Sequence, residues 1–70
     1  MKPDLDNLFS YHAPHGDQVE RYQRIREAAK AYAEVVLTCT PPSADQSAAI
    51  RQIRESCMTA NAAIACNEGP

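Results

Sequence analysis

Two adjacent prolines near the middle of the chain, Pro41 and Pro42, limit its fold more than any other feature of the sequence. Neither proline can donate a backbone hydrogen bond, and each restricts the conformation of the residue before it, so a helix cannot run through this point. On both sides, apolar or small residues recur at alternating spacings of three and four, which is the period of one helix face. The sequence therefore predicts two helices joined by a proline turn.

The first helix is predicted over residues 17–38, and residues 39–43 form the turn. The second helix is predicted over residues 44–68 because Ser43 and Gln46 match a capping box, in which each side chain satisfies a backbone amide of the other residue. Gly69 is a natural stop for this helix. The N-terminal segment, residues 1–16, is punctuated by prolines, and a short helix is expected within it over residues 4–9.

The two apolar stripes agree with an antiparallel hairpin. If the chain folds back near residue 41, residues that face each other share the same sum of residue numbers, and large residues should face small ones. The pairs that meet this condition are Tyr22 and Ala60, Ile25 and Cys57, Ala29 and Ile53, Tyr32 and Ile50, and Val36 and Gln46. The predicted fold class is therefore all-α, with a short N-terminal segment or helix followed by an antiparallel two-helix hairpin.

Self-association is expected because 70 residues are few for a stable core. Ordering costs about 1.5 kcal/mol per residue, which a single hairpin can scarcely offset by burial. We therefore treat residues 1–70 as one domain that assembles as a homo-oligomer. A second face of small residues is the expected contact; the alternative is that its alanines simply raise helix propensity. This face comprises Ala28, Ala31, Val35, Met58, Ala62 and Ala65.

The charge balance excludes several classes of partner. The formal net charge is -2, so no overall field attracts a DNA or RNA duplex or an anionic membrane. The longest apolar runs, such as residues 62–66, are far shorter than the roughly 20 residues that span a bilayer. No apolar signal core follows the N-terminus. A cytosolic protein is expected, and any anion must be held by a local cluster of cations.

The cysteines are expected to be reduced. Cys57 and Cys66 lie on one helix about 13 Å apart, beyond disulfide reach, and Cys39 lies at the turn. A metal site that combines them with His12 and His15 lacks the usual ligand spacings, so we expect no metal and no cofactor. The two histidines also have no nucleophile at a recognisable spacing, and the chain has no glycine-rich phosphate loop. A binding protein is expected rather than an enzyme.

Two arginines have no acidic residue at the positions that a helix places next to them. Arg26 and Arg54 lack an acid three or four positions away, whereas Lys30 has Glu27 and Glu34. Unpaired arginines can simply be solvated. They can also meet an external anion, and the planar guanidinium suits phosphate.

Tyr11 stands in a non-helical segment and belongs to no helical stripe. Aromatic faces stack nucleobases, so Tyr11 is a candidate base-binding residue. The alternative is a packing role that closes the end of the hairpin, which nearby Phe9 could also fill.

Several blocks of the sequence, in order, resemble the small phage sponge family that counters CBASS immunity. They are Phe9-Ser10-Tyr11-His12-Ala13-Pro14, Arg21-Tyr22 with Ile25-Arg26, Pro42-Ser43, and Met58-Thr59-Ala60-Asn61-Ala62-Ala63-Ile64-Ala65. The resemblance implies a homohexamer of helical hairpins in the host cell cytoplasm. It also implies that the protein sequesters cyclic dinucleotides such as 3′,3′-cyclic GMP-AMP without cleaving them. Some members also hold cyclic trinucleotides in separate sites.

By this resemblance, Tyr11 would stack on a base and Arg26 would meet phosphate, with His12 an adjacent candidate and a packing role expected for Phe9. The full set of candidate ligand-binding residues is Tyr11, Arg26, Phe9, His12, Lys30 and Arg54.

The sequence also departs from the family pattern. Related chains typically carry Trp at the position of Thr59, Arg at that of Cys66, and basic residues where Ala44 and Gln46 stand. Arg51 and Arg54 occupy positions where related chains more often have Thr and Glu. We therefore expect cyclic dinucleotides to bind more readily than cyclic trinucleotides. The alternative functions are a helical hairpin that docks on a host or phage protein, and a small virion or scaffold component.

Overall fold

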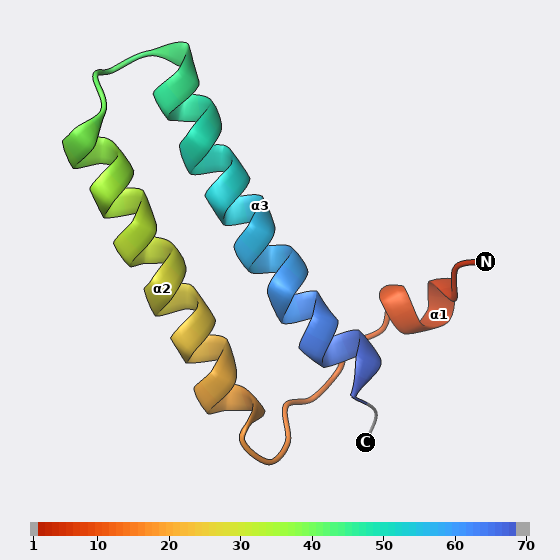
Figure 1. Cartoon of the computed structure of the whole chain (residues 1–70). Coiled ribbons are helices and arrows are strands. Elements are labelled where there is room, and N and C mark those ends of the chain that lie inside the picture. Colours follow the sequence, from red (N-terminus) through yellow and green to blue (C-terminus); the bar gives the residue numbers. More distant parts are fainter. Residues whose placement is uncertain (1, 69–70) are drawn as a thin grey trace.

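The computed structural model describes residues 2–68 and contains three helices in this range. Helix α1 covers Leu5–Leu8, α2 covers Gln18–Cys39 and α3 covers Ala44–Asn67. Helices α2 and α3 lie side by side and antiparallel (Figure 1), and the molecule measures 43 × 29 × 17 Å. The all-α fold class, a hairpin preceded by a short helix, is confirmed.

The structure shifts the bounds of the hairpin helices slightly. Helix α2 begins after Asp17 and extends one residue beyond the predicted 17–38, to Cys39. Thr40 ends it by turning to an extended conformation, and both its amide and its hydroxyl donate to the carbonyl of Val36. Helix α3 ends at Asn67 rather than at residue 68, and the expected stop at Gly69 lies outside the described residues.

Ser43 caps α3 as predicted, because its hydroxyl accepts a hydrogen bond from the amide of Gln46 at 3.1 Å. The other half of the predicted capping box does not form. The Gln46 side chain instead donates to the carbonyl and hydroxyl oxygens of Thr40, both at 3.1 Å. Gln46 therefore ties the start of α3 to the end of α2 across the proline turn.

The seam between the helices follows the predicted stripes with one exception. The α3 stripe is half-buried throughout, and so are Tyr22, Ile25, Ala29 and Val36 of α2. Tyr32, predicted for the seam, is 61 % exposed, and the small residue Ala33 is half-buried next to it. Tyr32 lies along the edge of the seam, because the rotation of about 100° per residue brings the adjacent Ala33 closer to its centre.

The two flanks of the seam form two distinct faces of the hairpin. On the front face, Ala28 and Tyr32 of α2 join Ser56 and Ala60 of α3 around a hollow of about 320 Å³. Each residue of a helix is rotated by about 100° about the helix axis from the residue before it. On two antiparallel helices that face each other, the residue directly after a seam residue therefore points to the same side of the hairpin. This side is the back face. Met58, which follows Cys57, lies on this back face.

The small-residue face expected for oligomer contact is therefore not continuous. Ala28, Ala31 and Val35 lie toward the front face, whereas Met58 and Ala62 lie toward the back. The prediction of one shared face was wrong because it considered each helix alone and not the direction in which each turns away from the seam.

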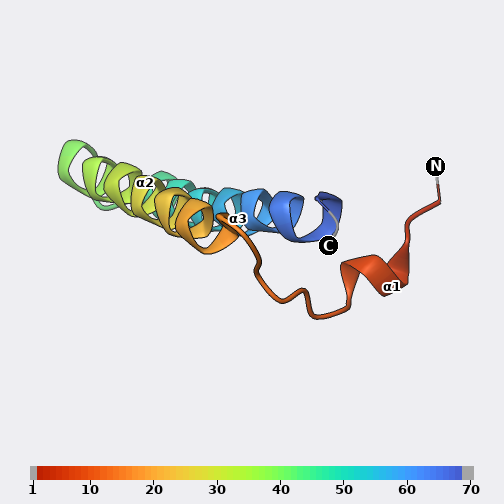
Figure 2. The same cartoon turned by 90° about the horizontal axis from the view of Figure 1, so that it is seen from below.

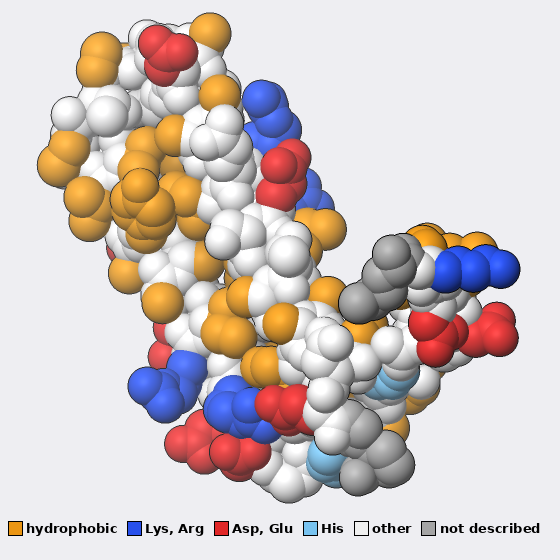
Figure 3. Space-filling view, turned by 45° about the vertical axis from the view of Figure 1, so that its right-hand side comes forward, with side chains coloured by type: hydrophobic (Ala, Val, Ile, Leu, Met, Phe, Trp, Pro, Cys, Tyr) orange, Lys and Arg blue, Asp and Glu red, His pale blue; other side chains and the backbone are white. Residues whose placement is uncertain are grey.

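Apolar side chains remain accessible on the hairpin. No hydrophobic residue among the described residues is fully buried, and Figure 3 shows hydrophobic side chains gathered over the seam. The large exposed ones are Leu5, Leu8, Phe9, Tyr11, Val19, Tyr32, Val35, Leu37 and Met58. Within residues 2–68, no helix combines the length and the apolar character needed to cross a bilayer.

The N-terminal segment runs past the end of α3 and carries α1 away from the hairpin (Figure 2). Asp4 caps α1 by accepting from the amide of Asn7 at 3.1 Å, and Phe9 ends it. The chain then turns into α2 at Gly16, whose φ of 57° lies in the left-handed region that glycine enters without a side-chain clash.

Candidate ligand-binding site

Tyr11 and Phe9 project from the N-terminal segment and are covered by little of the chain. Tyr11 is 87 % exposed and Phe9 is 84 % exposed. The packing role expected for Phe9 is therefore wrong within one chain, because little of the ring is covered by the hairpin. Tyr11 is likewise too exposed for the alternative role of packing against the end of the hairpin.

His12 is half-buried and holds the segment in place. Its Nε2 donates to the carbonyl oxygen of Asn7 at 2.7 Å, which requires the proton to be on Nε2. The Asn7 side chain in turn donates to the carbonyl oxygen of Cys66 at 2.8 Å. Since the last carbonyls of a helix have no partner within it, Asn7 fixes the segment to the end of α3. His12 therefore has a positioning role in the structure.

A cavity of about 320 Å³ lies between the N-terminal segment and the end of α3. Tyr11 and His12 are on its wall, so the cavity joins two of the candidate residues. The remaining lining residues are Asn7, Ala13, His15, Gln18, Ala65 and Cys66. Ala65, expected on the oligomer face, thus lines this cavity. In such a cavity the aromatic ring of Tyr11 can stack on a nucleobase, and the amide and imidazole groups beside it can form hydrogen bonds with the edge of the base.

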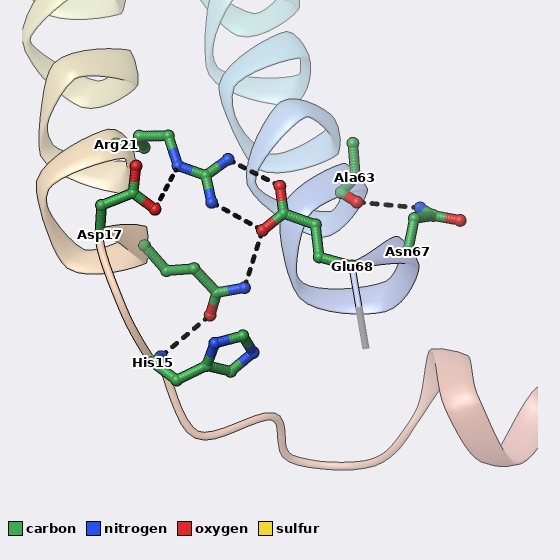
Figure 4. Close-up of polar contacts among 7 residues, drawn as sticks. His15, Asp17, Arg21, Ala63, Asn67 and Glu68 are labelled. Atoms are coloured by element: carbon green, nitrogen blue, oxygen red, sulfur yellow. Dashed lines mark hydrogen bonds and ion pairs between the residues drawn. The ribbon is translucent and has the colours of Figure 1, made fainter. Parts of the chain in front are cut away.

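A polar cluster closes the base of the cavity. Gln18, only 4 % exposed, accepts from the amide of His15 at 3.1 Å and donates to Glu68 Oε1 at 3.0 Å. Arg21 forms two hydrogen bonds with the Glu68 carboxylate and a third with Asp17 (Figure 4). The hydrogen bonds from Arg21 and then from Gln18 lower the pKa of Glu68 to about 2. The pKa of Arg21 is raised, chiefly by its hydrogen bonds to Glu68.

Sequence reasoning missed this cluster. Arg21 and Asp17 are four positions apart on neighbouring turns, but Glu68 lies 47 residues from Arg21 and no local spacing links the two. The hairpin register could have suggested the contact, because it brings the end of α3 beside the start of α2.

Arg26, Lys30 and Arg54 are exposed and lie on the back face, since each directly follows a seam residue. The ion pairs among residues 2–68 do not involve any of the three. The acidic neighbours that the sequence offers Lys30 form no ion pair with it. All three cations therefore keep their hydrogen-bond donors available to an external anion.

The structure does not bring all the candidate residues together. Tyr11 and His12 line the cavity at the end of the hairpin, and Arg26 does not line it. Arg26 lies further along α2, about 12 Å of helix rise from the start of α2 at Gln18. Within one chain, Tyr11 and Arg26 therefore do not share this cavity.

The described residues contain no group of three or more His, Cys, Asp or Glu side chains that could hold a metal ion. The three cysteines are free thiols, with Cys39 exposed and the other two half-buried.

The hairpin, with its exposed aromatic segment and unpaired cations, is similar to a known protein family. A family model described as the Acb2/Tad1 hairpin domain matches residues 1–65. The chain belongs to the Acb2/Tad1 hairpin family. This is the anti-CBASS sponge family, so the resemblance found in the sequence is confirmed. Comparison with curated proteins and with solved structures gives no match.

Proposed function

We propose that this Acb2/Tad1 hairpin protein is a phage-encoded sponge for cyclic oligonucleotide second messengers. It binds and sequesters cyclic dinucleotides such as 3′,3′-cyclic GMP-AMP in the host cytoplasm without cleaving them, which deprives the CBASS effector of its signal. The observation that carries the proposal is membership of the family over residues 1–65. The exposed ring of Tyr11 and the unpaired Arg26 supply the two chemistries that a cyclic dinucleotide needs, base stacking and phosphate binding.

The proposed sponge is a homohexamer in which Tyr11 of one chain meets Arg26 of another. Two observations support assembly. Tyr11 and Arg26 do not line the same cavity of one chain, and the front face leaves Tyr32 and Val35 more than half exposed, at 61 % and 56 %. Apolar surface of this kind is unfavourable in water and is covered when chains associate.

Cyclic trinucleotides are proposed as weaker ligands. Cys66 stands where related chains carry Arg, and its thiol lies beside the carbonyl oxygen of Asn7 at 3.9 Å. A half-buried thiol supplies no positive charge to a phosphate, so a site that depends on a cation at this position loses it.

The test is a calorimetric titration of the purified protein with a panel of cyclic di- and trinucleotides, followed by denaturation and chromatography of the ligand. A sponge binds the dinucleotide tightly and returns it unchanged, whereas an enzyme would return a linear product. Arg26→Ala should abolish binding while the oligomer persists in size-exclusion chromatography. Arg24→Ala is the matched control because it removes the same charge from the front side of α2.

Absence of heat with every cyclic nucleotide would overturn the proposal. Together with a monomer or dimer in solution, that result would favour a hairpin that docks on a host or phage protein, which a pull-down would recover. Loss of assembly in the Arg26→Ala variant would contradict the assignment of Arg26 as a ligand-binding residue.

A further inference from the structure

The back face of the hairpin places cations from both helices next to one another. Arg26 follows the seam residue Ile25, and Arg54 follows the seam residue Ile53. One step of about 100° from the seam turns toward the same side on both antiparallel helices, so the two arginines share a face. Ala28 and Ser56, three positions after the same isoleucines, line the hollow on the opposite face.

The hairpin register sets the heights of these cations. Ile25, Ala29, Ile53 and Cys57 line one hollow, in agreement with the pairing of Ile25 with Cys57 and of Ala29 with Ile53. Arg54 is therefore level with residue 28, between Arg26 and Lys30. Arg26 and Lys30 are about 6 Å apart along α2, and packed helices are about 8–10 Å apart. The long side chains of all three residues can reach one patch of surface.

The patch gathers three cations although the chain as a whole has a net charge of -2. None of the three cations forms an ion pair within residues 2–68. Glu27 and Glu55 directly follow Arg26 and Arg54, so each turns a further 100° or so, away from the patch. Glu34 lies one turn beyond Lys30 on the same face but forms no ion pair with it. In Figure 3, Lys and Arg side chains emerge beyond the outer edge of α3, with an Asp or Glu side chain beside them.

We propose that Arg26, Lys30 and Arg54 form a three-cation site that holds the two phosphodiesters of one cyclic dinucleotide. Arg26 alone would be insufficient to bind both phosphodiesters, and Arg54 completes the site together with Lys30. The inference rests on the proposed sponge function and adds the α3 side of the site to it. A cyclic dinucleotide carries two separated negative charges, and a guanidinium can donate two parallel hydrogen bonds to each phosphate. Both helices of one chain then bind phosphate, while Tyr11, at the far end of the hairpin, reaches the base from another chain.

The test is a calorimetric titration of the full-length protein with 3′,3′-cyclic GMP-AMP, using Arg54→Gln, Arg54→Lys and Arg24→Gln. Loss of a hydrogen bond to a charged group predicts binding about tenfold weaker, or more, for Arg54→Gln. Arg54→Lys should recover part of the affinity, because it keeps the charge without the planar fork. Arg24→Gln should bind as the unsubstituted protein does, because it makes the same charge change on the front side.

Equal binding by Arg54→Gln and the unsubstituted protein would overturn the inference and leave the sponge function intact. Equal weakening by Arg24→Gln and Arg54→Gln would also overturn it, because the effect would then come from net charge. Failure of the unsubstituted protein to bind would refute the sponge function itself. Helix content and oligomer size are measured for each variant, and Lys30→Gln on the other helix gives a second reading if Arg54→Gln alters assembly.

Discussion

The guanidinium of Arg21 and the carboxylate of Glu68 form a two-point contact, with Nη1 to Oε2 and Nη2 to Oε1 both at 2.6 Å. The pair joins the first turn of α2 to the residue that ends α3. The buried Gln18 also donates to Glu68 at 3.0 Å and accepts from His15. The open end of the hairpin and the segment that carries Tyr11 are thus held by one connected set of hydrogen bonds.

Glu68→Gln should make the protein less sensitive to acid. Because the pKa of Glu68 is lowered from 4.5 to about 2 in the folded protein, the ionised carboxylate favours folding. Its contribution is fully present above pH 4.5 and is lost as the pH falls through about 2. Thermal melts at fixed protein concentration should show a lower Tm for Glu68→Gln at pH 7, and a difference that closes toward pH 2.

Glu55→Gln is the control for this experiment, since Glu55 is an exposed residue of α3 whose carboxylate forms no ion pair within residues 2–68. Equal Tm values for Glu68→Gln and the unsubstituted protein across the pH range would contradict the role of the pair.

Ser43→Ala should destabilise the hairpin by about 1 kcal/mol, the usual cost of removing a helix N-cap. The Ser43 hydroxyl accepts from the amide of Gln46 at 3.1 Å, and alanine leaves that amide without a protein partner. Ser47→Ala is the matched control, because the Ser47 hydroxyl makes no hydrogen bond within the described residues and alanine has the higher helix propensity. Urea unfolding followed by circular dichroism measures both. Equal effects of the two substitutions would contradict the capping role.

Gly16→Ala should cost about 1 kcal/mol through the backbone alone. Gly16 has a φ of 57°, and a Cβ at this position would meet no atom within 4 Å, so the loss arises from conformation and not from a steric clash with a neighbour. Gly16→Asn should lose less, because asparagine tolerates the left-handed region better than alanine does. If alanine and asparagine are equally stable in urea unfolding, the turn does not require this conformation in solution.

The sequence was sufficient to predict the hairpin because its determinants are local. Pro41 and Pro42 break the helix, Ser43 restarts it, and the periodic stripes specify which sides meet. The position of Tyr32 was predicted incorrectly, because the spacing of the stripe does not decide which of two adjacent residues, Tyr32 or Ala33, lies closer to the centre of the seam.

The candidate site was less accessible to sequence reasoning, because its contacts span the chain. The Asn7 contact with Cys66 and the Arg21 contact with Glu68 join the two ends of the sequence, and neither has a local spacing that marks it. The face shared by Arg26 and Arg54 follows from the hairpin register, so it could be derived once the seam was known.

Tyr11→Leu should weaken binding of 3′,3′-cyclic GMP-AMP while Tyr11→Phe retains it. Stacking of an aromatic ring on a base contributes about 1–3 kcal/mol, which corresponds to a loss of roughly fivefold to 150-fold in affinity. Both substitutions remove the phenol hydroxyl, so their difference isolates the aromatic face. Because Tyr11 is 87 % exposed, neither variant should change the helix content measured by circular dichroism. Calorimetric titration gives the affinities, and equal binding by the two variants would mean that Tyr11 does not act through stacking.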